Sequence, residues 1–132
     1  MPNVLFDPTT AGLQRALDIR SRNHGLLTSN IANANTPGYK AQRLDFEASF
    51  NRAFEEVSSA VEMGEPVPLG SVDEHLEIAE EPTPPGRVDG NSVRREVEMG
   101  NLALNSIGYD ATVEMMNRRF AMLEYAASDG GR

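Results

Sequence analysis

The stretch from residue 30 to residue 46 constrains the fold of this 132-residue chain most, and it reads Asn-Ile-Ala-Asn-Ala-Asn-Thr-Pro-Gly-Tyr-Lys-Ala-Gln-Arg-Leu-Asp-Phe. Asparagine side chains compete with backbone hydrogen bonds, and Pro37 disfavours helical backbone at Thr36. Gly38 adopts positive φ without strain. Proline at the second position and glycine at the third position of Thr-Pro-Gly-Tyr fit a type II turn. The stretch therefore predicts the end of a helix followed by a tight turn.

The residues before this turn predict a helix over residues 9–34. Thr9 or Thr10 is a suitable N-cap, because a hydroxyl group accepts a hydrogen bond from a free backbone N–H. A seam then follows in alternating steps of four and three residues, with a polar stretch in its middle. Its members are Leu13, Leu17, Arg20, His24, Leu27, Ile31 and Ala34.

A longer helix is predicted over residues 91–127, with Asn91 or Ser92 as its cap and Gly100 as its only internal breaker. Its seam keeps heptad-type spacing over about four repeats. The seam consists of Met99, Leu102, Ser106, Tyr109, Val113, Met116, Phe120, Leu123 and Ala127. This helix would be about 50 Å long and the first about 35 Å long. A hairpin of the two leaves part of the longer seam without a partner, so we expect other subunits to bury it.

The middle of the chain predicts little packed structure. Residues 35–56 are expected to form the turn and an extended segment. Residues 57–90 read as an acidic, proline-rich loop or linker that is mobile, because burial there is too small to offset the entropy of ordering. Half of the twenty acidic residues and five of the eight prolines lie between 55 and 89. A short strand over residues 76–78 could pair with Val67 and Leu69.

These patterns predict an all-α fold. Long N- and C-terminal helices would pack as a coiled-coil hairpin, joined through the turn segment and the mobile middle region. A short N-terminal arm over residues 1–8 and a tail over residues 128–132 complete the expected organisation.

Composition and charge disfavour several classes of function. The net charge of −8 lies mostly in the middle segment, and neither flank carries the basic surface that nucleic acid requires. The chain has no cysteine, and its N-terminal residues resemble neither a secretory signal nor a membrane anchor. His24 and His75 have no ligand or triad context, and no pair of carboxylates suits acid-base catalysis. We therefore expect no enzyme activity, cofactor, metal site, nucleic acid or small-molecule substrate.

Residues 30–40 resemble the N-terminal signature of bacterial flagellar rod, hook and hook-associated proteins. The Arg-Leu-Asp-Phe continuation, the short length and the runs Leu-Ala-Leu-Asn-Ser-Ile-Gly-Tyr and Arg-Arg-Phe-Ala-Met-Leu-Glu-Tyr are similar to the proximal members of the flagellar basal body rod family. The resemblance covers roughly residues 10–50 and 90–127. Many relatives have Asp where this chain has Asn35. The resemblance marks as assembly signature Asn30, Asn33, Asn35, Thr36, Pro37, Gly38 and Tyr39.

The resemblance implies a structural subunit of the proximal rod, which is part of the drive shaft that transmits motor torque in flagellum-dependent motility. It implies export into the periplasmic space by the flagellar type III apparatus, without a cleaved signal peptide. The expected partners are copies of the chain, other rod proteins, the protein that joins the rod to the membrane ring, and the export apparatus. Polymerisation would use the terminal helices, with helix packing by Leu13, Leu17, Leu27, Ile31, Leu102, Tyr109, Val113, Met116, Phe120 and Leu123.

An alternative is a soluble helical export chaperone or adaptor for flagellar axial proteins. The Asn-Thr-Pro-Gly-Tyr turn argues for the rod subunit, because a chaperone has no evident need for it.

Overall fold

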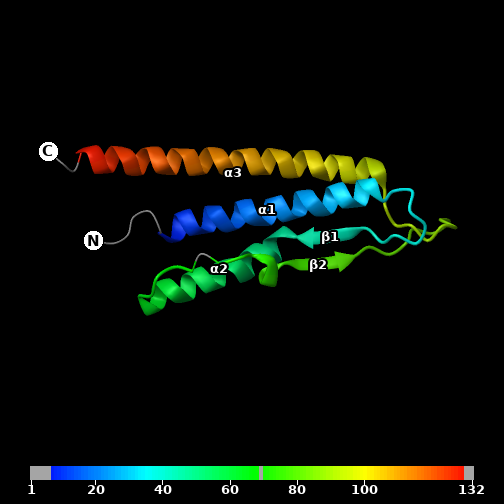
Figure 1. The fold of residues 1–132 in the computed structure, drawn as a ribbon, viewed down its shortest axis with the longest axis horizontal. Helices are drawn as coiled ribbons and strands as arrows, with labels where there is room; N and C mark the ends of the chain where they lie inside the picture. The colour runs from blue at the N-terminus through cyan, green and yellow to red at the C-terminus, as the bar shows by residue number, and fades with distance from the viewer. Residues whose placement is uncertain (1–6, 69, 130–132) are drawn as a thin grey trace.

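The computed structural model describes residues 7–68 and 70–129. These residues are mostly helical, and a two-stranded antiparallel sheet adds to the expected all-α fold. Helix α1 lies between α3 on one side and α2 with the sheet on the other, and α1 and α3 run antiparallel (Figure 1). The elements are α1 (Pro8–Ala32), β1 (Gln42–Asp45), α2 (Phe46–Met63), a 3-10 turn (Asp73–His75), β2 (Glu77–Glu80) and α3 (Arg95–Asp129).

Helix α1 confirms the predicted N-terminal helix but begins with a different cap. The side chain of Asp7 accepts a hydrogen bond of 2.8 Å from the backbone N–H of Thr10. Pro8 occupies the first turn, where its missing N–H has no consequence. The cap is therefore Asp7 and not Thr9 or Thr10, and α1 ends at residue 32 and not 34.

Helix α2 replaces part of the predicted extended segment and part of the predicted loop. Asp45 caps it by accepting a 3.0 Å hydrogen bond from the N–H of Ala48, and Gly64 ends it with a left-handed φ of 70°. Both signals were present in the sequence and are typical of helix ends. The prediction of extended or loop structure over residues 46–63 was wrong, because small and apolar residues recur there at helical spacing. Those buried on this face are Ser49, Ala53, Val57 and Ala60.

The main apolar core lies between α1, α2 and the sheet. Gly12 of α1 permits this approach, since a β-carbon there would lie 3.0 Å from the ring of Phe54. Phe46, Phe50 and Phe54 stack along α2 with ring centroids 6.0 and 5.6 Å apart. The buried members of the core are Ile19, Leu44, Ala53 and Val72.

The acidic middle segment is tied to α1 by one buried side chain. Arg15 is only 2% exposed, and its guanidinium donates to the carbonyl oxygens of Pro68, at 2.8 Å, and Gly70. It also lies 3.4 Å from the carboxylate of Glu56. Residues after α2 therefore return along α1.

Strand β2 pairs with β1, with Leu44 opposite Ile78. The predicted strand exists, but it begins one residue later and its partner is β1, so the proposed pairing with Val67 was wrong. Leu69, the other proposed partner, lies outside the described residues. The pairing is favoured by a salt bridge of 2.9 Å between Arg43 and Glu81 at one end of the ribbon.

Helix α3 starts at Arg95, four residues later than predicted, because Asn91 and Ser92 turn inward to other partners. It continues to Asp129, so residues 128 and 129 are helical and not a tail. Residues 1–6 of the expected arm and 130–132 of the expected tail lie outside the described residues. Within the described part of the chain, each helix is too short or too polar to cross a membrane.

Candidate assembly site at the asparagine-rich turn

Helix α1 ends in a run of tight turns organised by Asn33. Its backbone N–H bonds to the carbonyl of Ser29 at 3.1 Å, and its side-chain amide donates to the same carbonyl at 2.8 Å. The hydroxyl of Thr36 donates to the side-chain oxygen of Asn33 at 3.1 Å. The carbonyl of Ser29, in the last turn of α1, therefore has two donors, both from Asn33.

The predicted turn at Thr-Pro-Gly-Tyr is confirmed. Gly38 has φ +73°, as the third position of a type II turn requires, and the N–H of Tyr39 donates to the carbonyl of Thr36 at 3.3 Å. The N–H of Gly38 donates to the carbonyl of Asp89 at 2.8 Å. A β-carbon on Gly90 would lie 3.5 Å from the α-carbon of Gly38. The turn is therefore in contact with the segment that leads into α3.

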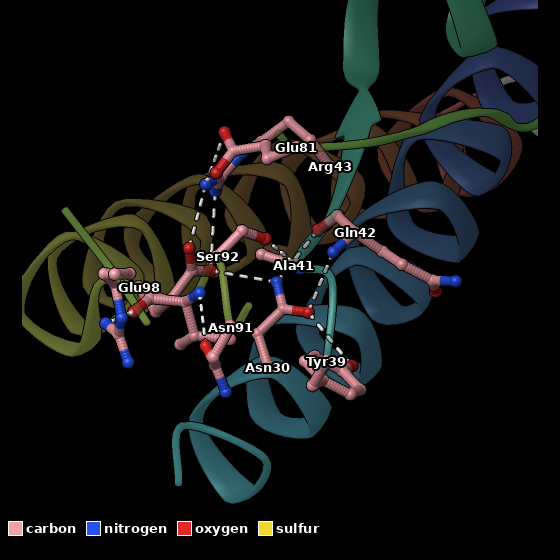
Figure 2. Close-up of polar contacts among 11 residues, drawn as sticks. Asn30, Tyr39, Ala41, Gln42, Arg43, Glu81, Asn91, Ser92 and Glu98 are labelled. Atoms are coloured by element: carbon pink, nitrogen blue, oxygen red, sulfur yellow. Dashed lines mark hydrogen bonds and ion pairs between the residues drawn. The ribbon is translucent and has the colours of Figure 1, made fainter. Parts of the chain in front are cut away.

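Asn30 is the centre of the site, and its amide uses every hydrogen-bonding position (Figure 2). Its Nδ2 donates to the carbonyl of Gln42 at 2.8 Å and to Oε2 of Glu98 at 3.0 Å. Its Oδ1 accepts from the N–H of Gln42 at 3.0 Å and from the hydroxyl of Tyr39 at 3.2 Å. This fully buried side chain joins α1, the turn, β1 and α3.

An ion-pair chain continues from Asn30 to the sheet. Glu98 is fully buried, and its Oε1 accepts from Arg43 at 2.8 Å. Arg43 also donates from Nε to Glu81 at 2.9 Å. The hydrogen bond from Arg43 lowers the pKa of the Glu81 carboxyl below its usual 4.5, and Glu81 and Glu98 raise the pKa of Arg43. A buried carboxylate is tolerated only when paired in this way.

The segment before α3 closes over the turn. Asn91 was predicted as a helix cap, but its Nδ2 donates to the carbonyls of Asn33, at 2.9 Å, and Thr36, at 2.8 Å. Ser92 was the other predicted cap, and its hydroxyl accepts a 2.7 Å hydrogen bond from the N–H of Ala41. Both side chains are buried. Asn91 thus satisfies carbonyls at the end of α1 and in the turn, Ser92 satisfies the N–H just before β1, and neither caps α3.

Among the predicted signature side chains, Asn30 bonds to Tyr39 and Asn33 bonds to Thr36. Asn35 and Pro37 are exposed. Sequence reasoning did not assign Arg43 or Glu98 to this site. Their opposite charges, 55 positions apart, gave no local signal that they pair. A role of these residues in assembly stays a prediction.

The buried side chains of α3 are polar. Glu98, Asn105 and Thr112 are buried and lie seven residues apart along α3. Asn105 donates to the carbonyl of Arg20 at 2.9 Å and accepts from the amide of Asn23 at 3.1 Å. Seven residues beyond Thr112, Arg119 forms an ion pair with the carboxylate of Asp7.

The residues predicted for helix packing are covered to different degrees. Leu27 is buried, whereas Tyr109 is 39% exposed and Phe120 is 44% exposed. The others are half-buried, namely Leu13, Leu17, Ile31, Leu102, Val113, Met116 and Leu123. Their packing between subunits stays a prediction.

Another face of α3 carries exposed large apolar side chains, which we call the α3 stripe. Its members are Leu104, Ile107, Met115, Met122 and Tyr125, each between 56% and 71% exposed. Ala111 and Arg118 complete the helical spacing of three and four residues.

Within residues 7–68 and 70–129, no three His, Asp or Glu side chains gather in a way that could hold a metal ion. His24 is exposed, and His75 lies 3.3 Å from Glu56.

Comparison with known proteins identifies the family of the chain. Residues 12–40 match the family described as flagella basal body rod protein. The chain is 30% identical to flagellar basal body rod protein FlgB of Bacillus subtilis, over 96% of this chain and 98% of that protein. It is 32% identical to FlgB of Aeromonas hydrophila, over 91% and 92%, and 36% identical to FlgB of Cereibacter sphaeroides, over 83% and 85%. The chain therefore belongs to the flagellar basal body rod protein family, and it is a structural subunit of the flagellar rod.

Proposed function

We propose that this subunit polymerises in the proximal rod by packing the α3 stripe against the terminal helices of neighbouring copies and of other rod proteins. The carrying observation is the exposure of five large apolar side chains along one face of a 35-residue helix. The buried side chains of α3 are polar, so its exposed apolar face is left for intermolecular coiled-coil packing.

The asparagine-rich turn supports this function by fixing α3 relative to α1. Asn30 of α1 bonds to Glu98 of α3, and Asn91, just before α3, bonds to the carbonyl of Asn33 at the end of α1, so the stripe is held in one position relative to the rest of the subunit. A subunit that keeps its shape under load transmits motor torque passively, as part of a drive shaft.

The remaining elements of the proposal follow from family membership. The subunit would be exported by the flagellar type III apparatus without a cleaved signal peptide and would assemble in the periplasmic space. Its partners would include the protein that joins the rod to the membrane ring.

The test is a double substitution in the stripe, Leu104→Asp with Ile107→Asp, expressed in a flagellated bacterium that lacks its own copy of this gene. Both side chains are exposed, so the single chain should fold. Rods and motility should be lost, because charges would enter an apolar interface. Asn117→Asp is the matched control, since it adds a charge at an exposed position of the same helix outside the stripe. Normal rods with the double variant would contradict the proposal.

A further inference from the structure

A groove of about 420 Å³ lies where α1 ends and α3 begins, and three of its lining residues are arginines. Glu96 is the only acidic residue in its wall. Val97 adds exposed apolar surface, whereas Ala34 and Val93 are buried. In a chain of net charge −8, such a site is locally basic. We call it the basic groove, lined by Ala34, Asn35, Arg87, Val93, Arg94, Arg95, Glu96 and Val97.

Two of these arginines are placed unfavourably for an isolated subunit. Arg94 and Arg95 stand at the N-terminal end of α3, where the helix dipole is positive and repels cations. Both are exposed, and neither forms a salt bridge with another described residue. Arg87 differs, because it pairs with Asp89 and donates to the carbonyl of Val93 at 2.9 Å.

The end of α2 has the opposite mismatch. Glu62 lies in the last turn, where the helix dipole is negative, and Glu65 follows just after the cap. The last turn contains no basic residue. Val61 and Met63 are 45% and 67% exposed beside them. We call Val61, Glu62, Met63 and Glu65 the acidic tip.

We propose that the acidic tip of one copy docks in the basic groove of the next copy. The inference rests on the proposed polymerisation and adds a second contact to it. The negative end of α2 would meet the positive end of α3, carboxylates would meet Arg94 and Arg95, and the apolar side chains of the tip would cover Val97. The docking relieves both mismatches at once.

The geometry suits an axial polymer. Figure 1 shows α2 ending near the end of the molecule where α1 starts, whereas α3 starts at the opposite end of the long axis. A contact between different surfaces at opposite ends is heterologous, and such contacts build open filaments when they do not close into a ring. The contact would repeat from copy to copy.

Charge reversal tests the contact in the purified full chain, with self-association followed by sedimentation velocity over a concentration series. Arg94→Glu with Arg95→Glu should weaken association at least about tenfold, because like charges would then face each other. Glu62→Arg with Glu65→Arg should do the same. The chain with all four changes should associate within about threefold of wild type, since complementarity returns. All four positions are exposed, and circular dichroism would verify helix content.

Three outcomes would overturn the contact. They are double variants that associate like wild type, a fourfold variant no better than the double variants, and wild type that does not self-associate. If association depends on Leu104 and Ile107 but ignores these four charges, the proposed function stands and the head-to-tail contact falls. If self-association depends on these four charged residues but tolerates aspartate at Leu104 and Ile107, the head-to-tail contact stands and the proposed packing of the α3 stripe falls.

Cross-linking gives an independent readout, because the chain contains no cysteine. A mixture of the single variants Arg95→Cys and Glu62→Cys should form a disulfide-linked heterodimer under mild oxidation. Arg95→Cys mixed with Asn117→Cys is the matched control and should yield far less. Equal yields in the two mixtures would overturn the proposed contact.

Discussion

The buried side chains of Asn30 and Glu98 bond to each other at 3.0 Å although they are 68 positions apart in the chain. One belongs to the end of α1 and the other to the first turns of α3. Neither side chain has access to water, so each depends on the other and on its remaining protein partners. This bond links directly the two helices that carry the family resemblance.

Replacing Asn30 with Leu should lower the free energy of unfolding by about 3 kcal/mol, because partners on Gln42, Tyr39 and Glu98 lose a buried hydrogen bond. Urea unfolding followed by circular dichroism at fixed protein concentration measures the change. Asn35→Leu is the control, since Asn35 is exposed, and its effect should stay within about 0.5 kcal/mol. Equal effects of both substitutions would show that the buried network contributes nothing.

Arg15→Met should destabilise the chain by about 3 kcal/mol and expose the return segment after α2 to proteases. Methionine retains the apolar stem but leaves the carbonyls of Pro68 and Gly70 without their charged donor. The control is Arg22→Met, which removes an exposed salt bridge to Asp73 and should change stability by less than about 1 kcal/mol. Limited proteolysis with mapping of the first cleavage site distinguishes the two variants. An unchanged cleavage pattern in Arg15→Met would contradict this reading of the segment.

Gly38→Ala should lower stability by about 1–2 kcal/mol, because a β-carbon is strained at φ +73°. Gly25→Ala is the matched control, for Gly25 lies inside α1 with open space around it. That substitution should raise stability by about 1 kcal/mol through helix propensity. Thermal and urea unfolding of the pair should shift in opposite directions. A shift in the same direction would mean that the turn relaxes around the new side chain.

Acid should weaken the fold partly through Glu81, whose pKa is lowered by the hydrogen bond from Arg43. A carboxyl group with a lowered pKa in the folded state stabilises that state above its ordinary pKa of 4.5, and the contribution is lost as pH falls through the lowered value. Unfolding free energies measured between pH 7 and about pH 3 should therefore fall more steeply in wild type than in Glu81→Gln. Parallel curves for the two proteins would exclude this contribution.

The parts of the fold that follow from local chemistry could be predicted from the sequence. Asparagines, Pro37 and Gly38 specify the turn through their own backbone preferences, and the apolar spacing specifies the terminal helices. Helix α2 carried the same kind of signal in its Asp45 cap and its apolar face. The acidic residues and prolines that follow it nevertheless led to the prediction of a loop that began inside this helix.

The polar contacts could not be predicted in the same way. Arg15 reaches carbonyls more than fifty positions away, and its sequence neighbourhood carries no sign of them. Glu98 and Asn105 lie buried on the face of α3 toward α1. Neither belongs to the apolar seam that the sequence pattern predicts. Hydrophobic patterns locate surfaces that avoid water, whereas buried hydrogen-bonded pairs depend on the completed topology.

The seven-residue line of polar side chains on α3 has a mechanical consequence. Two helices that pack through apolar side chains alone can slide past one another by one turn, because similar apolar contacts form in the new position. Glu98, Asn105 and Arg119 instead make directional bonds with fixed counterparts on α1 and at its cap. Sliding by one turn would break all of these bonds at the same time. The helix pair therefore resists shear along its axis.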